Sequence, residues 1–187
     1  MFKEIPFSTN LLGYASLGAM VTAVICTCLA IGLPYWEYND VSLASQQNLT
    51  NHGLWIYCIK YQPESTSLLD TCGDPLDIAT SDGKTDIQAA RALVIIALIL
   101  ELAAGVSTVM ILFVWKRKYF IHYVAAGLAI AAGFFSMFTL AVYNARIRKD
   151  DYDLHVCTTL DIIAWLVAWT SAGFIIYMAL VKKQDES

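Results

Sequence analysis

Charged residues are scarce in this sequence, and their scarcity excludes an ordinary soluble domain. They make up 15% of the chain, while hydrophobic residues make up 58%. Soluble domains have roughly 25% charged and 45–50% apolar residues, so this apolar excess would find no place in one. The formal net charge of -4 is small and no basic stripe is present. We therefore expect no nucleic-acid partner.

The motifs of common catalytic sites are also absent from the sequence. It contains no glycine-rich phosphate loop, no Gly-x-Ser-x-Gly elbow and no pair of acids within an apolar run. The three histidines show no metal-ligand spacing relative to one another or to the cysteines. We predict that the protein is not an enzyme and holds no cofactor or metal.

Long apolar runs dominate the chain instead. Four of them are long enough to cross a bilayer, whose hydrocarbon core needs about 20 helical residues. Because the bilayer offers no water to backbone groups, all four runs should be helical. The predicted spans are residues 11–33, 87–115, 119–143 and 161–181, in a single domain of 187 residues.

The segments between the spans predict the orientation. The turn at 116–118 reads Lys-Arg-Lys, and the lysines near both termini lie on its side of the membrane. Arginines and a lysine after residue 145 oppose this assignment, but the positive-inside rule on balance favours cytoplasmic termini. A plasma-membrane protein is then expected, with extracellular loops at 34–86 and 144–160, a cytoplasmic turn at 116–118 and a tail at 182–187. The Asn48 glycosylation sequon agrees, because glycans are added on the lumenal side.

The first extracellular loop is too long to be a passive connector. Gly53–Tyr61 is rich in aromatic and β-branched residues, which is typical of a strand, and Tyr35–Tyr38 suits a partner strand. We predict an all-α bundle of four transmembrane helices with a small extracellular antiparallel β-sheet. Cys58 and Cys72 both lie in this loop, on the side where disulfides persist.

Six residues of this loop together resemble the signature of the claudin superfamily: Trp36, Gly53, Leu54, Trp55, Cys58 and Cys72. This superfamily includes the peripheral myelin proteins, the epithelial membrane proteins and the calcium-channel gamma subunits. Gln88–Leu93, which contains Arg91, resembles the claudin segment that enters the second helix. The resemblance implies a Cys58–Cys72 disulfide, which the chain-entropy model values at about 3 kcal/mol. Trp36 and Trp55 are expected to pack against it.

Claudins are cell–cell junction proteins whose extracellular sheets associate within one membrane and across two. The resemblance therefore implies self-association, or association with related four-helix proteins, in cis and in trans. The loop between Trp36 and Asp86 has eight acids and two lysines, so a paracellular barrier or a cation-selective pathway is implied. Glu64, Asp70 and Asp74 are the candidates for a cation-attracting surface; a merely solvated acidic face is the alternative.

The resemblance also allows a second function. The gamma-subunit branch implies an auxiliary subunit that modulates an ion channel or receptor through extracellular and transmembrane contacts. The Asn48 sequon favours this branch, because claudins usually carry no glycan there, whereas the Gln88–Leu93 segment favours the claudin branch.

Polar residues in or near the spans receive separate predictions. Glu101 is an intramembrane acid, expected either to bond inside the bundle with Ser107, Thr22 or Thr139, or to contact a partner's helix. Arg91 is expected to tie its helix to the sheet through carbonyls or an acid. Asp161 suits a helix N-terminus.

The remaining cysteines and the recurring small residues also carry predictions. Cys26 and Cys28 are expected to be buried inert thiols, and Cys157 either to be free or to bridge another chain. Small residues recur at four-residue spacing in three spans and favour close helix packing, either within the bundle or at a subunit interface in the membrane. They are Ala15, Ala19, Ala23, Ala125, Ala129, Gly133, Ala164, Ala168 and Ala172.

Overall fold

The computed structural model describes residues 9–43, 46–62, 69–114, 119–147 and 153–185. Within these residues, four helices are long and apolar enough to cross a membrane. They are α1 (Thr9–Gly32), α3 (Ser81–Phe113), α4 (Tyr119–Val142) and α5 (Val156–Asp185). The predicted class, a four-helix membrane bundle with a small antiparallel sheet, is confirmed.

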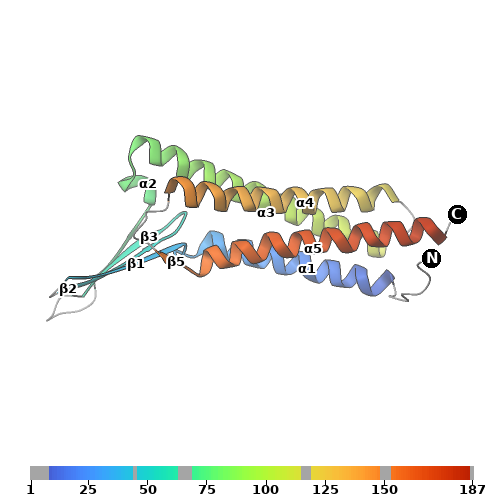
Figure 1. The fold of residues 1–187 in the computed structure, drawn as a ribbon, viewed down its shortest axis with the longest axis horizontal. Helices are drawn as coiled ribbons and strands as arrows, with labels where there is room; N and C mark the ends of the chain where they lie inside the picture. The colour runs from blue at the N-terminus through green and yellow to red at the C-terminus, as the bar shows by residue number, and fades with distance from the viewer. Residues whose placement is uncertain (1–8, 44–45, 63–68, 115–118, 148–152, 186–187) are drawn as a thin grey trace.

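The helices form an elongated bundle with the sheet at one end (Figure 1). Helix α1 packs against α3 and α5, and α4 packs against the same two helices. The first residue of α1 and the last of α5 lie at the end away from the sheet (Figure 1). The sheet therefore stands on one side of the membrane that the helices would cross.

Small residues allow the helices to approach closely. Ala164, Ala168 and Ala172 are all buried on α5, and Ala125 and Ala129 are buried on α4. These two rows lie inside the bundle, as their spacing predicts.

Gly133 and Ala15 have environments that differ from those of the buried alanines. Gly133 on α4 lies directly beside the indole nitrogen of Trp169, so that even a Cβ at this position would overlap the ring. In α1, Ala23 is buried but Ala15 is exposed. Ala15 therefore does not pack within the bundle, because α1 turns that part of its surface away from the other helices.

The sheet has five antiparallel strands in the order β4-β3-β2-β1-β5. The strands are β1 (Glu37–Leu43), β2 (Gln46–His52), β3 (Tyr57–Gln62), β4 (Leu69–Gly73) and β5 (Asp153–Leu154). The short strand β5 comes from the second predicted loop and pairs with the start of β1. Both loops thus contribute to one sheet.

Two details of the predicted strands are wrong. The strand expected from Gly53 begins at Tyr57, because the amide of Gly53 donates to the carbonyl of Ile56 (2.8 Å) and closes a turn. The strand that leaves α1 pairs with β2 and not with β3. Strand β2 was not predicted, because it carries few of the β-branched and aromatic residues that mark strands.

The helix ends also differ from the predicted spans. Helix α3 begins at Ser81, six residues early, because the Thr80 side chain accepts from the amide of Gly83 (3.4 Å). A short helix α2 (Pro75–Ile78) precedes it, and a π-helical turn (Tyr143–Ile147) follows α4. Helix α5 begins at Val156, so the prediction that Asp161 stands at its N-terminus is wrong.

Candidate functional site: the sheet and its anchor on the bundle

Trp36 completes the sheet-side end of α1. Pro34 follows the helix and cannot continue it, so the last carbonyls of α1 need partners from elsewhere. The indole nitrogen of Trp36 donates to the carbonyl of Ala30 (2.7 Å). The amide of Leu33 donates to the carbonyl of Leu29 (3.0 Å). Trp36 therefore acts as a side-chain cap on the helix from which its own strand departs.

The Trp36 ring is fully buried beneath the sheet, with an exposed fraction of 0%. Its centroid lies 4.8 Å from that of Tyr143, the first residue of the π-helical turn. Leu54, Ala90 and Val94 belong to the same buried cluster. The ring thus joins α1, α3, the end of α4 and the sheet in one apolar core.

The backbone of Trp36 also fixes the start of α5. Its carbonyl accepts from the amide of His155 and from the hydroxyl of Thr158, both at 3.0 Å. The amide of Cys157 donates to the carbonyl of Tyr35 (2.9 Å). These bonds hold His155, the residue before α5, and satisfy the amide of Cys157 in its first turn. The helix therefore begins at Val156, and Asp161 is placed inside it.

Gly53 allows the turn before β3 to lie on the end of α1. A Cβ at this position would come within 2.7 Å of Pro34 Cα and 2.9 Å of the Ile56 carbonyl oxygen. Both contacts are with backbone, which cannot easily move aside. The Gly-Leu-Trp sequence therefore has a packing reason: Gly53 permits the approach, and Leu54 enters the core with 1% exposure.

Arg91 links α3 to this turn, as predicted. Its Nε donates to the carbonyl of Leu54 (2.8 Å), and its Nη2 pairs with Asp74 Oδ1 at 2.6 Å. The guanidinium also lies over the Trp55 ring, 5.4 Å from its centroid. One arginine thus holds the turn and the start of α2 against α3.

Asp74 is occupied by protein groups on one side. It caps α2 by accepting from the amide of Leu76 (2.9 Å), and 44% of its side chain is exposed. The hydrogen bond from Arg91, followed by that from the Leu76 amide, lowers the pKa of the Asp74 carboxyl below its usual value. It is therefore a carboxylate at neutral pH, with Arg91 offsetting much of its charge. Its role in attracting cations stays a prediction.

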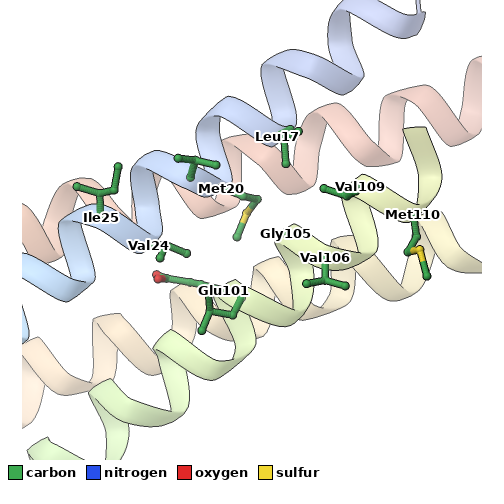
Figure 2. Close-up of a pocket in the computed structure, with 11 residues that line it drawn as sticks. Leu17, Met20, Val24, Ile25, Glu101, Gly105, Val106, Val109 and Met110 are labelled. Carbon is green, nitrogen blue, oxygen red and sulfur yellow. The ribbon is translucent and has the colours of Figure 1, made fainter. Parts of the chain in front are cut away.

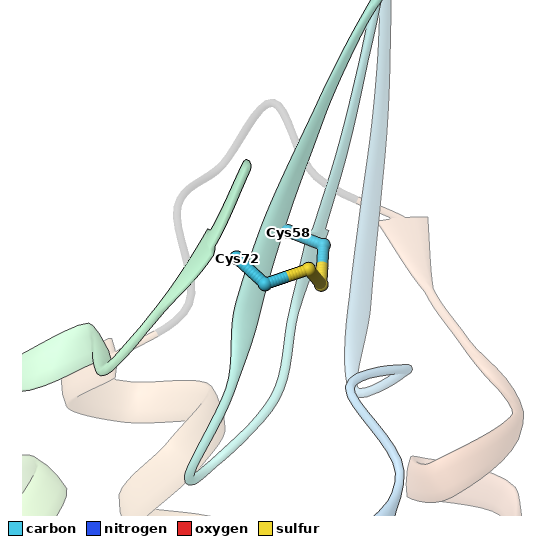
Figure 3. The surroundings of a disulfide bond; sticks show 2 residues. All are labelled: Cys58 and Cys72. Atoms are coloured by element: carbon cyan, nitrogen blue, oxygen red, sulfur yellow. A yellow bond between two sulfur atoms is a disulfide. The ribbon is translucent and has the colours of Figure 1, made fainter. Parts of the chain in front are cut away.

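Cys58 and Cys72 form the predicted disulfide. The two residues are directly opposed in the β3–β4 pair, so the bond joins edge strand β4 to the sheet (Figure 3). Trp36 lies in the buried cluster with Leu54 and Tyr143, and the Trp55 ring lies beside Arg91. Packing of the two tryptophans against the disulfide stays a prediction.

The structure places two of the three remaining loop residues that were predicted as site residues. Asn48 lies in central strand β2 and Asp70 in edge strand β4. Glu64 lies outside the described residues. Glu37, counted among the loop acids, is buried with 3% exposure and does not contribute to a solvated acidic face.

Glu101 is buried between α1 and α3, but its predicted partners are wrong. Thr27 donates to Glu101 Oε1 at 2.9 Å. Ser107, Thr22 and Thr139 instead donate to carbonyls of their own helices, four residues earlier. A hydroxyl that donates its one proton to its own helix in this way cannot donate it to Glu101 as well.

Asp161 is a second buried carboxyl, and its place inside the bundle was not predicted. Its Oδ1 accepts from the Ser136 hydroxyl on α4 (2.7 Å), and its exposed fraction is 0%. The missed signal was the helical pattern before it: Val156 and Leu160 already continue the apolar run.

The free cysteines also differ in environment. Cys26 is buried, whereas Cys28 is exposed on the outer surface of α1, which corrects its predicted burial. Cys157 is free and buried, with its sulfur 3.6 Å from the carbonyl oxygen of Leu33. Because the Cys157 thiol is buried, it is poorly placed to form a disulfide with another chain. Within the described residues, no group of three or more metal-ligating side chains gathers.

The fold and this anchor define a multi-pass membrane protein that carries a disulfide-closed sheet at one end of a four-helix bundle. The family model described as PMP-22/EMP/MP20/Claudin tight junction matches residues 21–181. The chain therefore belongs to this family, and the resemblance drawn from the sequence is confirmed. A search of curated proteins found no match.

Proposed function

We propose that the protein is a claudin-like cell–cell junction or adhesion protein of the plasma membrane. In this proposal both termini are cytoplasmic and the sheet projects outside the cell. The sheet binds further copies or related four-helix proteins in cis and in trans, and it forms or regulates a paracellular barrier or cation-selective pathway. The membrane boundaries predicted from the sequence are part of this proposal.

The observation that carries this proposal is the double attachment of the sheet to the bundle. Trp36 fixes the origin of β1, and Arg91 fixes the turn that leads into β3. A sheet held in this way keeps a fixed orientation relative to the membrane. Contacts made by many copies can then repeat with one geometry, as an ordered assembly requires.

Two exposed features at the sheet end could make such contacts. Strand β4 forms one edge of the sheet, and a sheet edge is a natural place to bind another chain. Ile78, at the end of α2, is 57% exposed although it is apolar. The excess of acids over lysines in the first loop supports cation attraction over anion attraction.

An auxiliary subunit of an ion channel or receptor is the second candidate. The position of Asn48 favours it, because this sequon lies on β2, between β1 and β3. A glycan on this central strand would restrict the contacts between copies. Contacts with a larger partner would then use the remaining surfaces and the membrane helices.

Co-purification in mild detergent distinguishes the two functions. The tagged protein, expressed in its native tissue or cells, is captured and its companions are identified by mass spectrometry. The junction proposal predicts recovery of the protein itself and of related four-helix proteins. Recovery of a channel or receptor near one-to-one would contradict it and support the auxiliary role.

A further inference from the structure

Helices α1 and α3 separate within the bundle and leave a groove of about 370 Å³. Its walls come from the face of α1 between Leu17 and Ile25 and the face of α3 between Glu101 and Met110 (Figure 2). Helix α1 runs toward the sheet and α3 runs away from it. The Ile25–Glu101 end of the groove is therefore the end nearer the sheet.

Glu101 is the one polar side chain among the described residues that line this groove. Thr27 donates to its Oε1, but within the described part of the chain Oε2 is buried without a hydrogen-bond partner. An unsatisfied buried oxygen is costly. A protonated carboxyl would need an acceptor at Oε2, and a carboxylate would need a donor. A hydroxyl group can supply either.

We propose that this groove binds a membrane sterol, with the sterol hydroxyl at Glu101 and the fused rings between α1 and α3. The volume lies within the range of small-molecule pockets, which are mostly apolar with a few placed polar groups. The walls contain four valines (Val21, Val24, Val106 and Val109). Their β-branched side chains are stiff and suit a rigid ring system better than a flexible chain.

The order of polar and apolar residues along the groove agrees with this orientation. Glu101 is at the end of the groove nearer the sheet, and the apolar lining extends from it away from the sheet. A sterol in the leaflet next to the sheet has the same polarity along its length.

Other occupants fit less well. A phospholipid headgroup carries a phosphate, which needs several donors, and the described lining offers none besides the Glu101 carboxyl. A partner's transmembrane helix binds to a surface and does not require a hollow. The sterol site uses a surface different from the sheet, so it goes beyond the function proposed above.

The test is photolabelling of the full chain in phosphatidylcholine proteoliposomes. A sterol carrying a diazirine and an alkyne is added at low mole fraction, and labelled peptides are mapped by mass spectrometry. Label is expected in the groove-lining parts of α1 and α3, and excess unlabelled cholesterol should displace it. No opposing membrane is present, so the result does not depend on contacts between sheets.

A matched pair of glycine variants locates the site. A side chain at Gly105 would grow into the groove, since its Cβ would meet only Met20 Cβ, at 3.9 Å. Gly127 on α4 is exposed, and a Cβ there would have nothing within 4 Å. Gly105→Leu should reduce groove labelling about fivefold or more, by occlusion, and Gly127→Leu should leave it unchanged. Val106→Trp provides a second groove-filling variant if Gly105→Leu fails to fold.

Variants of Glu101 test the polar contact. Glu101→Gln keeps both a donor and an acceptor and should retain labelling. Glu101→Leu removes the hydrogen bond and should weaken binding at least about threefold. The proposal is overturned if labelling lies outside the groove, if cholesterol does not displace it, or if the groove-filling variants label normally. A diacylglycerol probe that labels the groove and resists cholesterol would also overturn it.

Discussion

Trp36→Ala is expected to lower the free energy of unfolding by about 3–5 kcal/mol, the range found for large aromatic truncations in cores. Three losses coincide at this position. The ring contacts with Tyr143 disappear, the cavity lies in a cluster shared by three helices, and the Ala30 carbonyl loses its donor. Typical domains are stable by only 5–15 kcal/mol. The variant should therefore lose the sheet's attachment as well as stability, measured by unfolding in detergent micelles.

Trp36→Phe separates packing from the hydrogen bond. Phenylalanine keeps most of the ring contacts but cannot donate to Ala30, a loss of about 1 kcal/mol together with a smaller cavity term. The alanine variant should thus be clearly the less stable of the two. Equal, small effects of both substitutions would show that the Trp36 ring does not support the sheet.

Removal of the disulfide is expected to have the second-largest effect. The bonded residues are 14 apart in sequence, and the chain-entropy model gives about 3 kcal/mol for a loop of this size. The double variant Cys58→Ser, Cys72→Ser should therefore unfold earlier, with β4 separating first because the bond secures this edge strand. Thermal unfolding gives the stability, and limited proteolysis reports the exposure of β4.

Cys28→Ser is the matched control for the disulfide variant. Cys28 is free and exposed on α1, so the same chemical change there should have little effect. Since Cys72 is exposed, reductant added to the native protein should reproduce the loss of stability. Stability equal to that of Cys28→Ser would contradict the role given to the disulfide.

The parts of the fold that the sequence predicted are those governed by long-range composition. Four apolar runs predicted four helices because every spanning backbone must satisfy its own hydrogen bonds. The Trp36 to Cys72 signature located the sheet, since its residues are chemically unusual and widely spaced. Arg91 was predictable for a related reason: a charge one turn inside the predicted apolar span needs partners nearby.

The parts that the sequence did not predict depend on pairing across space. Strand β2 is polar and follows from its position between β1 and β3. The partner of Glu101 is Thr27, which only the α1–α3 packing brings within reach. The start of α5 was misplaced because it is fixed by the carbonyls of Tyr35 and Trp36, over 100 residues earlier.

The architecture joins two surfaces with different partners. The sheet end carries the edge strand β4, the exposed Ile78 and the acidic loop, which we assign to contacts outside the membrane. The α1–α3 groove carries Glu101 and apolar walls, which we assign to a sterol. Trp36 lies in a cluster that includes residues of α1 and α3, so it connects the sheet to both groove helices.

Enrichment at contacts between two expressing cells tests the central claim most directly. Two populations of weakly adherent cells, expressing the protein with different fluorescent tags, are mixed and imaged. Both colours should concentrate where the two populations meet, and not where either meets a non-expressing cell. Ile78→Asp should reduce this enrichment, whereas Thr85→Asp, at another exposed position near the sheet end, should not. Equal density at every contact would contradict a sheet that binds across two membranes.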